Sequence, residues 1–303
     1  MDRLTSIEVF ARVVETGSFA AAAERLGIGR AAASKHVLRL EERLGARLLN
    51  RTTRRVGLTE EGAAFYERCS RILAELEEAE HDLGAARREP RGTLRINAPV
   101  SFGVLHLGAA IGAFAIRYPQ VRIALALNDR FVDLVEEGFD VAVRIGRLPS
   151  SSLVARRICE TRLVPVASPG YWARHGKPAL PEDLRRHNCL IYTLQAGSDW
   201  RFVGADGAEH HVTVGGSISA SNGDVLRAAA LDGVGVALLP DFIAGPDVRR
   251  GDLVEALPSY RPPVLGVHAV YPPTRHVPAK LRAFIDFLGE RFSPLPSWSL
   301  AAG

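Results

Sequence analysis

A dense block of basic residues near the amino terminus, residues 25–57, limits what the first part of this chain can form. It carries nine basic and two acidic side chains, a balance of +7 over 33 residues, whereas the whole 303-residue chain has a net charge of +4. Apolar residues recur regularly within the block, so the charge lies on a folded surface rather than on a disordered arm. A concentrated cationic surface predicts DNA as the partner. The basic residues are Arg25, Arg30, Lys35, Arg39, Arg43, Arg47, Arg51, Arg54 and Arg55.

Three short helices are predicted within the first 44 residues. Apolar side chains from Leu4 to Val14 recur at helical spacing, and Gly17 ends that helix. Ser18 caps a second, alanine-rich helix over residues 19–26. A third helix is predicted over residues 30–44, with one apolar face and one small, basic face. The apolar stripe is Ala33, Val37, Leu40 and Leu44, and the opposite face is Arg30, Ala31, Ser34, Lys35 and Leu38.

The second and third helices, joined by a glycine-containing turn, predict a helix-turn-helix. A major groove about 12 Å wide admits one helix, and the small side chains of Ala31 and Ala32 permit a close approach. Arg30, Ser34 and Lys35 are then placed to meet base edges or phosphates. The alternative is a solvated helix face that is basic for no functional reason.

The segment that follows the third helix predicts a short β-hairpin, or wing. Thr and Val alternate there, and its four arginines would lie along a phosphate backbone or enter a minor groove. The complete set of predicted DNA-binding residues is Ser18, Arg30, Ala31, Ala32, Ser34, Lys35, Arg39, Arg51, Thr52, Thr53, Arg54 and Arg55.

These motifs resemble those of the LysR-type transcriptional regulators, which are bacterial winged helix-turn-helix proteins. The chain departs from the family pattern at Gly29, a weaker helix cap than the usual Ser, and at Arg30 and His36, where Gln is common. The departures concern which bases are recognised and leave the mode of binding intact. The matching phrases include Gly17-Ser18-Phe19-x-x-Ala22-Ala23, Ala33-Ser34-Lys35, Leu40-Glu41-x-x-Leu44-Gly45, Leu48-Leu49-Asn50-Arg51 and Leu58-Thr59-x-x-Gly62.

A long helix is predicted over residues 60–87. Between Gly62 and Gly84 there is neither proline nor glycine, and apolar residues recur at alternating spacings of four and three, which is a heptad seam. Such a helix would run about 40 Å, too long to be covered by a small domain of its own chain, so it should pair with a second copy. The alternative is a solvent-exposed spacer. The predicted dimerisation residues are Phe65, Cys69, Ile72, Leu76, Ala79 and Leu83.

The remainder of the chain predicts two α/β lobes. Residues 94–96, 121–127 and 141–145 are expected to be strands, with helices over residues 101–117 and 130–137, the second capped by Asp129 and ended by Gly138. A second unit begins near residue 162. Its expected strands are 162–166, 190–192, 200–203, 212–214 and 234–239, its helices start at 169 and 224, and residues 264–271 and 279–292 return to the first unit.

Ligands of such sheets gather where a strand ends and the next helix begins. Two turns of this kind occur, at residues 97–102 and 219–223, and Arg144 at the end of a strand could pair with a carboxylate. These features predict a small organic anion as the ligand. The alternatives are helix capping for Ser101 and Ser221 and a structural ion pair for Arg144.

This part resembles the co-inducer-binding domain of the same family, which is similar in fold to periplasmic solute-binding proteins. The resemblance implies effector contacts, a dimer or tetramer on an inverted-repeat operator, and contact with RNA polymerase. The matching phrases include residues 140–146, Ala167-Ser168-Pro169-x-Tyr171 and Gly233-x-Gly235-Val236-Ala237-x-Leu239-Pro240, and the implied effector contacts are Val100, Ser101, Phe102, Arg144, Ser221 and Asn222.

The sequence thus predicts a winged helix-turn-helix domain over residues 1–58, a dimerisation helix over 59–90 and a two-lobed α/β effector domain over 91–303. Lobe I is expected to comprise 91–161 and 266–303, and lobe II 162–265. An enzyme is disfavoured because no nucleophile elbow, zinc-protease motif or phosphate-binding loop occurs, and an exported solute binder because no signal peptide is found. We expect a cytoplasmic protein without cofactor, metal or membrane span. The three cysteines are expected to be packed hydrophobes rather than redox sensors.

Overall fold

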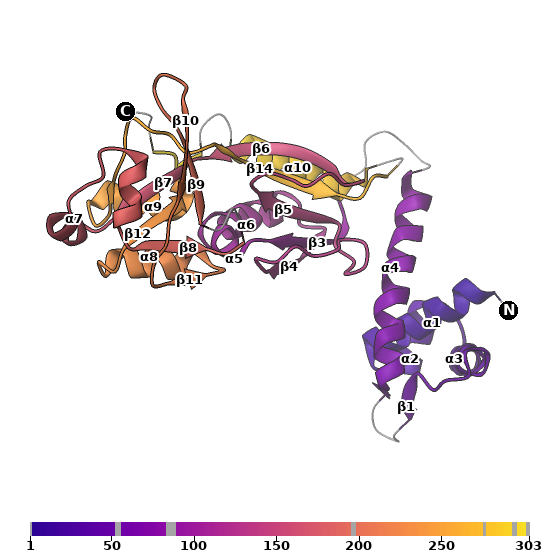
Figure 1. The fold of residues 1–303 in the computed structure, drawn as a ribbon. Coiled ribbons are helices and arrows are strands. Elements are labelled where there is room, and N and C mark those ends of the chain that lie inside the picture. The colour runs from indigo at the N-terminus through magenta and orange to yellow at the C-terminus, as the bar shows by residue number, and fades with distance from the viewer. Residues whose placement is uncertain are drawn as a thin grey trace. The chain divides into compact units, whose positions relative to one another are not determined.

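The computed structural model describes residues 2–51, 56–82, 89–194, 198–274, 277–292 and 296–300. The chain forms two compact units, Met1–Arg88 and Glu89–Gly303. Figure 1 shows the succession of elements, with helices and a short hairpin in the first unit, and two five-stranded sheets and a further hairpin in the second.

The first unit contains the three predicted helices. Helix α1 (Arg3–Thr16) ends at Gly17, whose φ of 64° is a left-handed conformation suited to glycine. Helix α2 (Phe19–Arg25) is capped by the Ser18 hydroxyl, which accepts a hydrogen bond from the Ala21 N–H. Helix α3 (Arg30–Leu44) begins at Gly29 without a side-chain cap and ends at Gly45, as the sequence predicted.

A two-stranded antiparallel hairpin follows α3. Strand β1 (Leu49–Arg51) pairs with β2 (Val56–Leu58), with Leu49 opposite Leu58. The hairpin prediction is confirmed for these strands. The predicted contacts Thr52, Thr53, Arg54 and Arg55 lie outside the described residues.

Helix α4 (Glu60–Asp82) starts against this hairpin. The Thr59 hydroxyl donates to the Arg47 carbonyl (2.7 Å) and accepts from the Gly62 N–H (2.9 Å), so Thr59 ties the start of the helix to the end of the preceding loop. A Cβ atom at Gly62 would overlap with the Leu48 carbonyl, which explains why only glycine fits there.

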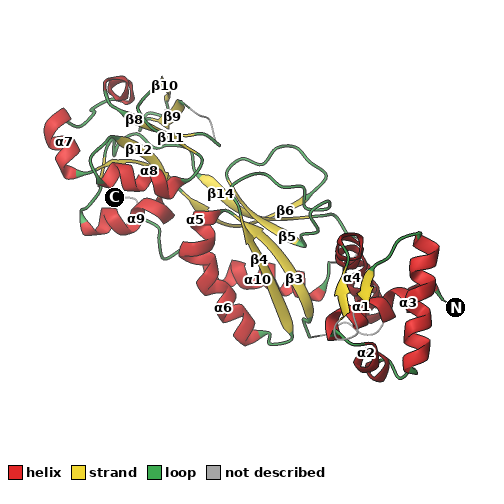
Figure 2. Cartoon of the chain, turned by 90° about the horizontal axis from the view of Figure 1, so that it is seen from below, coloured by secondary structure: helices red, strands yellow, loops and turns green. Residues whose placement is uncertain are grey.

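The first sheet of the second unit has the strand order β4-β3-β5-β14-β6 (Figure 2). Strand β3 (Gly92–Ala98) lies parallel to β4 (Val121–Leu127) and β5 (Val141–Ile145). Strand β14 (Leu265–Tyr271) runs antiparallel between β5 and β6 (Val154–Thr161). Helix α6 (Gly108–Arg117) packs on β4, and α10 (Ala279–Phe292) packs on β3 and β6.

The second sheet has the order β11-β8-β12-β7-β13. Strands β11 (Ser219–Ala220), β8 (Cys189–Tyr192) and β12 (Val236–Pro240) are parallel, and β7 (Leu163–Ala167) and β13 (Val254–Glu255) run antiparallel to their neighbours. Helices α8 (Gly223–Leu231) and α9 (Asp241–Arg250) contact this sheet and each other.

Smaller elements lie beside the second sheet. Helix α7 (Pro169–His175) is capped by Ser168 and ends at Gly176, as predicted. The antiparallel hairpin of β9 (Asp199–Val203) and β10 (Glu209–Thr213) contacts the 3₁₀ helix Pro181–Arg186. Trp200 and Phe202 of this hairpin are buried, which agrees with the expectation that Trp200 belongs to the core.

Three expectations are corrected. Residues 130–137 form no helix: Asp133 caps the N–H groups of Val135 and Glu136, and only a turn over 134–138 follows. The edge strand β6 went unpredicted because its exposed, charged sequence shows no apolar alternation. Helix α9 went unpredicted because Pro246 lies inside it and disguises the helical pattern.

One core joins the two sheets of the second unit. Phe102, Phe114, Phe284 and Trp298 are among its fully buried side chains. The helical segment Val100–Arg117 is long and apolar enough to cross a membrane by length and composition alone. Its Phe102, Leu107, Ala110 and Phe114 side chains lie in this core, as expected for a core helix.

Candidate functional site

Helix α3 presents its basic side away from the core of the first unit. Arg30, Ala31, Lys35 and Arg39 are exposed, and Ala32 and Ser34 are half-buried. Ala33, Val37 and Leu40 are buried on the other side. Leu44 is 41% exposed, so the predicted apolar stripe ends one turn early, at Leu40. The predicted outer face is thus accessible along its length.

His36 does not share this accessible face. It is buried, and its Nδ1 atom lies 3.0 Å from the hydroxyl oxygen of Ser6 on α1. The sequence comparison placed His36 among residues that bear on base recognition, and the structure corrects this assignment. His36 instead joins α3 to α1.

Glu41 fixes the hairpin to α3. Its Oε1 atom accepts hydrogen bonds from the backbone N–H groups of Leu48 (2.8 Å) and Leu49 (3.1 Å), and the side chain is buried. A buried carboxylate that accepts two backbone N–H groups sets the direction in which the chain enters β1. Glu41 lies in a family motif, yet its role could not be predicted without the fold.

The predicted dimerisation residues separate into two groups. Cys69 is buried in the core of its own unit, and the half-buried Phe65 packs on Phe10 with ring centroids 5.7 Å apart. Phe65 and Cys69 are therefore corrected from seam positions to intramolecular core positions. Ile72 is 50% exposed and Leu76 36% exposed. The structure describes no side-chain environment for Ala79, and Leu83 lies outside the described residues.

Three of the predicted effector residues meet at the junction of the two sheets. Ser101 is the second residue of the helical segment that begins at Val100 after β3, and Asn222 caps α8 after β11. The Ser101 hydroxyl donates to Asp224 Oδ2 (2.6 Å), and the Asn222 amide donates to Asp129 Oδ2 (3.0 Å). Asp129 Oδ1 in turn accepts from the Val100 N–H (2.9 Å). Asp129 is thus a partner of Val100 rather than the helix cap that the sequence suggested.

Two predicted effector residues do not join this group. Phe102 is buried and packs on Phe242 and Trp298, with centroids 5.4 and 5.6 Å away, so it is a core residue. Ser221 is exposed and precedes the residue that caps α8. The capping alternative is also wrong for Ser101, because the residue that precedes its helix is Pro99.

Arg144 is buried in β5 without a carboxylate partner among the described residues. It is 8% exposed, its Nη1 donates to Asn97 Oδ1 (2.6 Å), and its Nη2 has no hydrogen-bond partner. Burial lowers the pKa of this guanidinium, against a smaller opposing effect of Glu137. The ion-pair alternative therefore fails, and one donor of a buried cation stays available for an acceptor.

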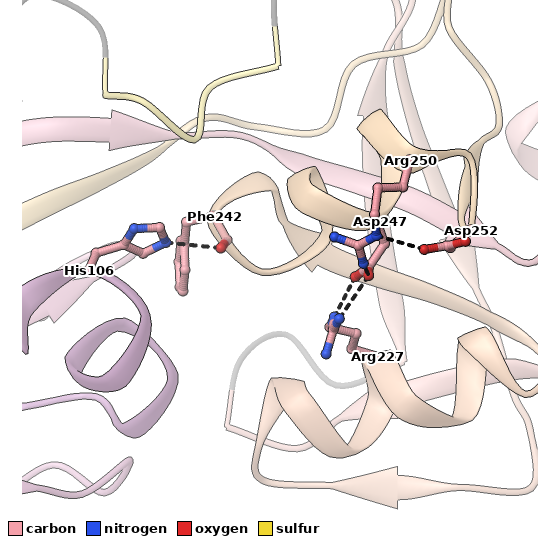
Figure 3. A network of polar contacts seen from close by, with 6 residues as sticks. All are labelled: His106, Arg227, Phe242, Asp247, Arg250 and Asp252. Carbon is pink, nitrogen blue, oxygen red and sulfur yellow. Dashed lines mark hydrogen bonds and ion pairs between the residues drawn. The ribbon is translucent and has the colours of Figure 1, made fainter.

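Ionic and aromatic contacts fix the elements that carry these residues. The carboxylate of Asp247 on α9 is fully buried and pairs with Arg227 of α8 and with Arg250 (Figure 3). The distance between Arg227 Nη2 and Asp247 Oδ1 is 2.7 Å. His106 Nε2 lies 3.0 Å from the Phe242 carbonyl, which joins the segment after Ser101 to α9. Burial lowers the pKa of His106.

The cysteines, the metal-ligating side chains and a surface hollow were the other candidates for a functional site among the described residues. Burial raises the pKa of Cys159 and Cys189 to about 12, so both thiols stay protonated, as expected for packed cysteines. No group of three metal-ligating side chains occurs among the described residues. A hollow of about 260 Å³ elsewhere in the unit contains none of the predicted effector residues and is lined by Arg147, Arg201, Phe202, Val203, Glu209, His211 and Pro263.

A winged helix-turn-helix followed by a two-sheet α/β unit defines a class of bacterial transcriptional regulator. The family model described as "Bacterial regulatory helix-turn-helix protein, lysR family" matches residues 4–63, and "LysR substrate binding domain" matches residues 87–293. The chain belongs to the LysR family of transcriptional regulators.

Relatives and solved structures agree with this assignment. The chain is 40% identical over 288 residues to the HTH-type transcriptional regulator CrgA of Neisseria meningitidis serogroup C, covering 94% of this chain and 95% of CrgA. The solved structure of Neisseria meningitidis CrgA superimposes with a TM-score of 0.61 at 36% identity, covering 97% of this chain and all of that one. The full-length structure of AphB from Vibrio cholerae superimposes with a TM-score of 0.58 at 32% identity, covering 95% of this chain and 98% of AphB. These relatives are named regulators, so the chain is a regulator rather than an enzyme.

Proposed function

We propose that this regulator binds an inverted-repeat operator in double-stranded DNA as a homodimer or homotetramer. The observation that carries the proposal is the exposed face of α3, where Arg30, Lys35 and Arg39 project from a helix whose opposite side is buried. A helix of this form enters the major groove and leaves its basic side chains against bases and phosphates. The hairpin of β1 and β2 forms the wing.

A mobility-shift assay with the DNA upstream of the protein's own gene tests this proposal. Lys35→Ala should weaken binding to all sequences and reduce the slope of log affinity against log salt by about 1, because one phosphate contact is lost. Arg12→Ala is the matched control, since Arg12 lies on α1 and pairs with Glu15. Operator selection with Arg30→Gln should change base preference. A shift insensitive to salt would contradict the proposal.

The segment of residues 59–90, which contains helix α4 (Glu60–Asp82), is the proposed dimerisation element between domains at 1–58 and 91–303. Ile72 and Leu76 are apolar, exposed and one helical turn apart, so pairing with a second copy would remove both from water. The double variant Ile72→Glu, Leu76→Glu should lower the sedimenting mass. The control Glu67→Gln changes an exposed residue of the same helix. An unchanged sedimenting mass would contradict the placement of the dimer interface at Ile72 and Leu76.

The second unit is proposed to bind a small organic effector that carries a carboxylate. The buried, partly unsatisfied guanidinium of Arg144 supports this, because a carboxylate supplies the missing acceptor. Calorimetry of the full chain against aromatic and aliphatic carboxylic acids should identify binders, and Arg144→Gln should weaken them about tenfold or more. The exposed Arg147→Gln is the control. We further propose a cytoplasmic location and contact with RNA polymerase at the promoter.

A further inference from the structure

Three hydrogen bonds connect the two sheets at the proposed effector site, and the longest is donated by the Asn222 amide to the Ser101 hydroxyl oxygen (3.5 Å). Ser101 and Asp129 follow strands β3 and β4 of the first sheet, whereas Asn222 and Asp224 lie at the start of α8 beside the second sheet. The Ser101–Asp224 bond is 2.6 Å long and the Asn222–Asp129 bond 3.0 Å. Each therefore crosses from one lobe to the other.

Backbone N–H groups orient the Asp129 carboxylate and the Asn222 side chain. Asp129 accepts the Val100 N–H with one oxygen and the Asn222 amide with the other. Asn222 accepts the Asp224 N–H (3.0 Å), which orients its amide toward Asp129. Gly223 permits this arrangement, because a Cβ atom there would lie 2.6 Å from Ile243 Cδ1 on α9. The four side chains thus form a connected network.

The network places the chain's own carboxylates where ligand acceptors would bind. A serine hydroxyl and an asparagine amide are donors suited to the oxygens of an organic acid. Here the Ser101 hydroxyl already holds Asp224, and the Asn222 amide already holds Asp129. An incoming carboxylate would have to displace an aspartate or meet its like charge.

We propose that Asp224 and Asp129 form a built-in latch that holds the lobes together without effector. The proposal rests on the proposed effector site and adds its regulation. In the effector-free chain Asp224 acts as a surrogate ligand for Ser101, and an effector shifts the lobes by replacing this contact. Charge-assisted bonds are stronger than neutral ones, and Ser101 is buried, so the contacts suit this role.

Hydrogen–deuterium exchange of the full-length protein without effector tests the latch. Ser101→Ala should speed exchange in the distant peptide 219–226 by about threefold or more, and Asp224→Ala should do the same in peptide 97–102. The double variant should resemble Ser101→Ala, because that variant already removes the contact between Ser101 and Asp224. The control Ser151→Ala, which loses only a local bond to Leu153, should leave both peptides unchanged. Ser101→Ala removes a single hydroxyl and keeps the test valid if Asp224→Ala unfolds.

Unchanged exchange in peptide 219–226 of the folded Ser101→Ala protein would overturn the latch. A second measurement separates this failure from that of the effector site. Calorimetry with benzoate and succinate should show tighter binding to Asp224→Ala, by about tenfold, because a competing carboxylate is gone. Equal or weaker binding would count against the latch and leave the site standing. If neither acid nor the wider panel binds any variant, the effector site fails while the exchange result still decides the latch.

Discussion

The Nδ1 atom of His36 lies 3.0 Å from the Oγ atom of Ser6, and both residues are buried between α3 and α1. Together with the buried Ala33, Val37 and Leu40, this contact holds one side of α3 against the core of the unit. The basic side of α3 therefore faces outward.

Replacing His36 should affect stability rather than sequence recognition. We expect His36→Ala to lower the free energy of unfolding by roughly 1–3 kcal/mol, since it removes a buried hydrogen-bond partner and leaves a void. Chemical denaturation measures this loss. In the double variant with Ser6→Ala, the loss in free energy of unfolding should be smaller than the sum of the two single losses. A changed base preference in operator selection would contradict the assignment and return His36 to the DNA interface.

Removing the Glu41 carboxylate should release the hairpin. Each of its two hydrogen bonds to backbone N–H groups contributes about 1.5–3 kcal/mol when one partner is charged, so Glu41→Ala should lose stability and DNA affinity together. Glu41→Gln keeps an acceptor and should lose less. The control is Glu42→Ala, which changes the exposed neighbour. Equal losses for the alanine variants of Glu41 and Glu42 would rule out this role.

Asp247 should contribute more stability than its neighbour Asp252. Asp247 is fully buried between Arg227 and Arg250, whereas Asp252 is 51% exposed. We expect Asp247→Ala to cost about 3 kcal/mol, the low end for a broken buried pair because both arginines reach solvent. Asp252→Ala should cost about 1 kcal/mol or less. Thermal unfolding of both variants provides the comparison, and similar values would contradict it.

His106 should make the second unit less stable as the pH falls. Burial lowers its pKa in the folded chain, so below the ordinary value of about 6.5 the unfolded chain binds a proton that the folded chain resists. The free energy of unfolding should therefore decrease between pH 7 and pH 5. His106→Gln retains a donor for the Phe242 carbonyl and should flatten this dependence. If the free energy of unfolding falls with pH equally in the wild-type chain and in His106→Gln, the effect belongs instead to His187 and His268, whose pKa values burial also lowers.

Local signals predicted much of the fold. Gly29 and Gly45 bound α3 at the expected residues, and Ser18 caps α2 as its position suggested. The errors came from contacts that are distant in sequence. His36 was linked to base recognition by its place in the family pattern, because its partner Ser6 lies 30 residues away. Asp129 was taken for a cap because its partner Asn222 lies 93 residues away and is brought near only by the packing of two sheets.

The same limit applies to the effector site. Ser101 and Asn222 were predicted from the turns that carry them, but Asp224 was not, since a carboxylate in the first turn of a helix is explained by the helix dipole alone. Phe102 was wrongly included because it adjoins Ser101 in sequence, whereas along a helix adjacent residues face different directions.

The two connections between the sheets of the second unit run next to each other. Strand β6 ends at Thr161, directly opposite Leu265, where β14 begins. Any rotation of one sheet relative to the other therefore bends or twists the backbone at this one pair of strands.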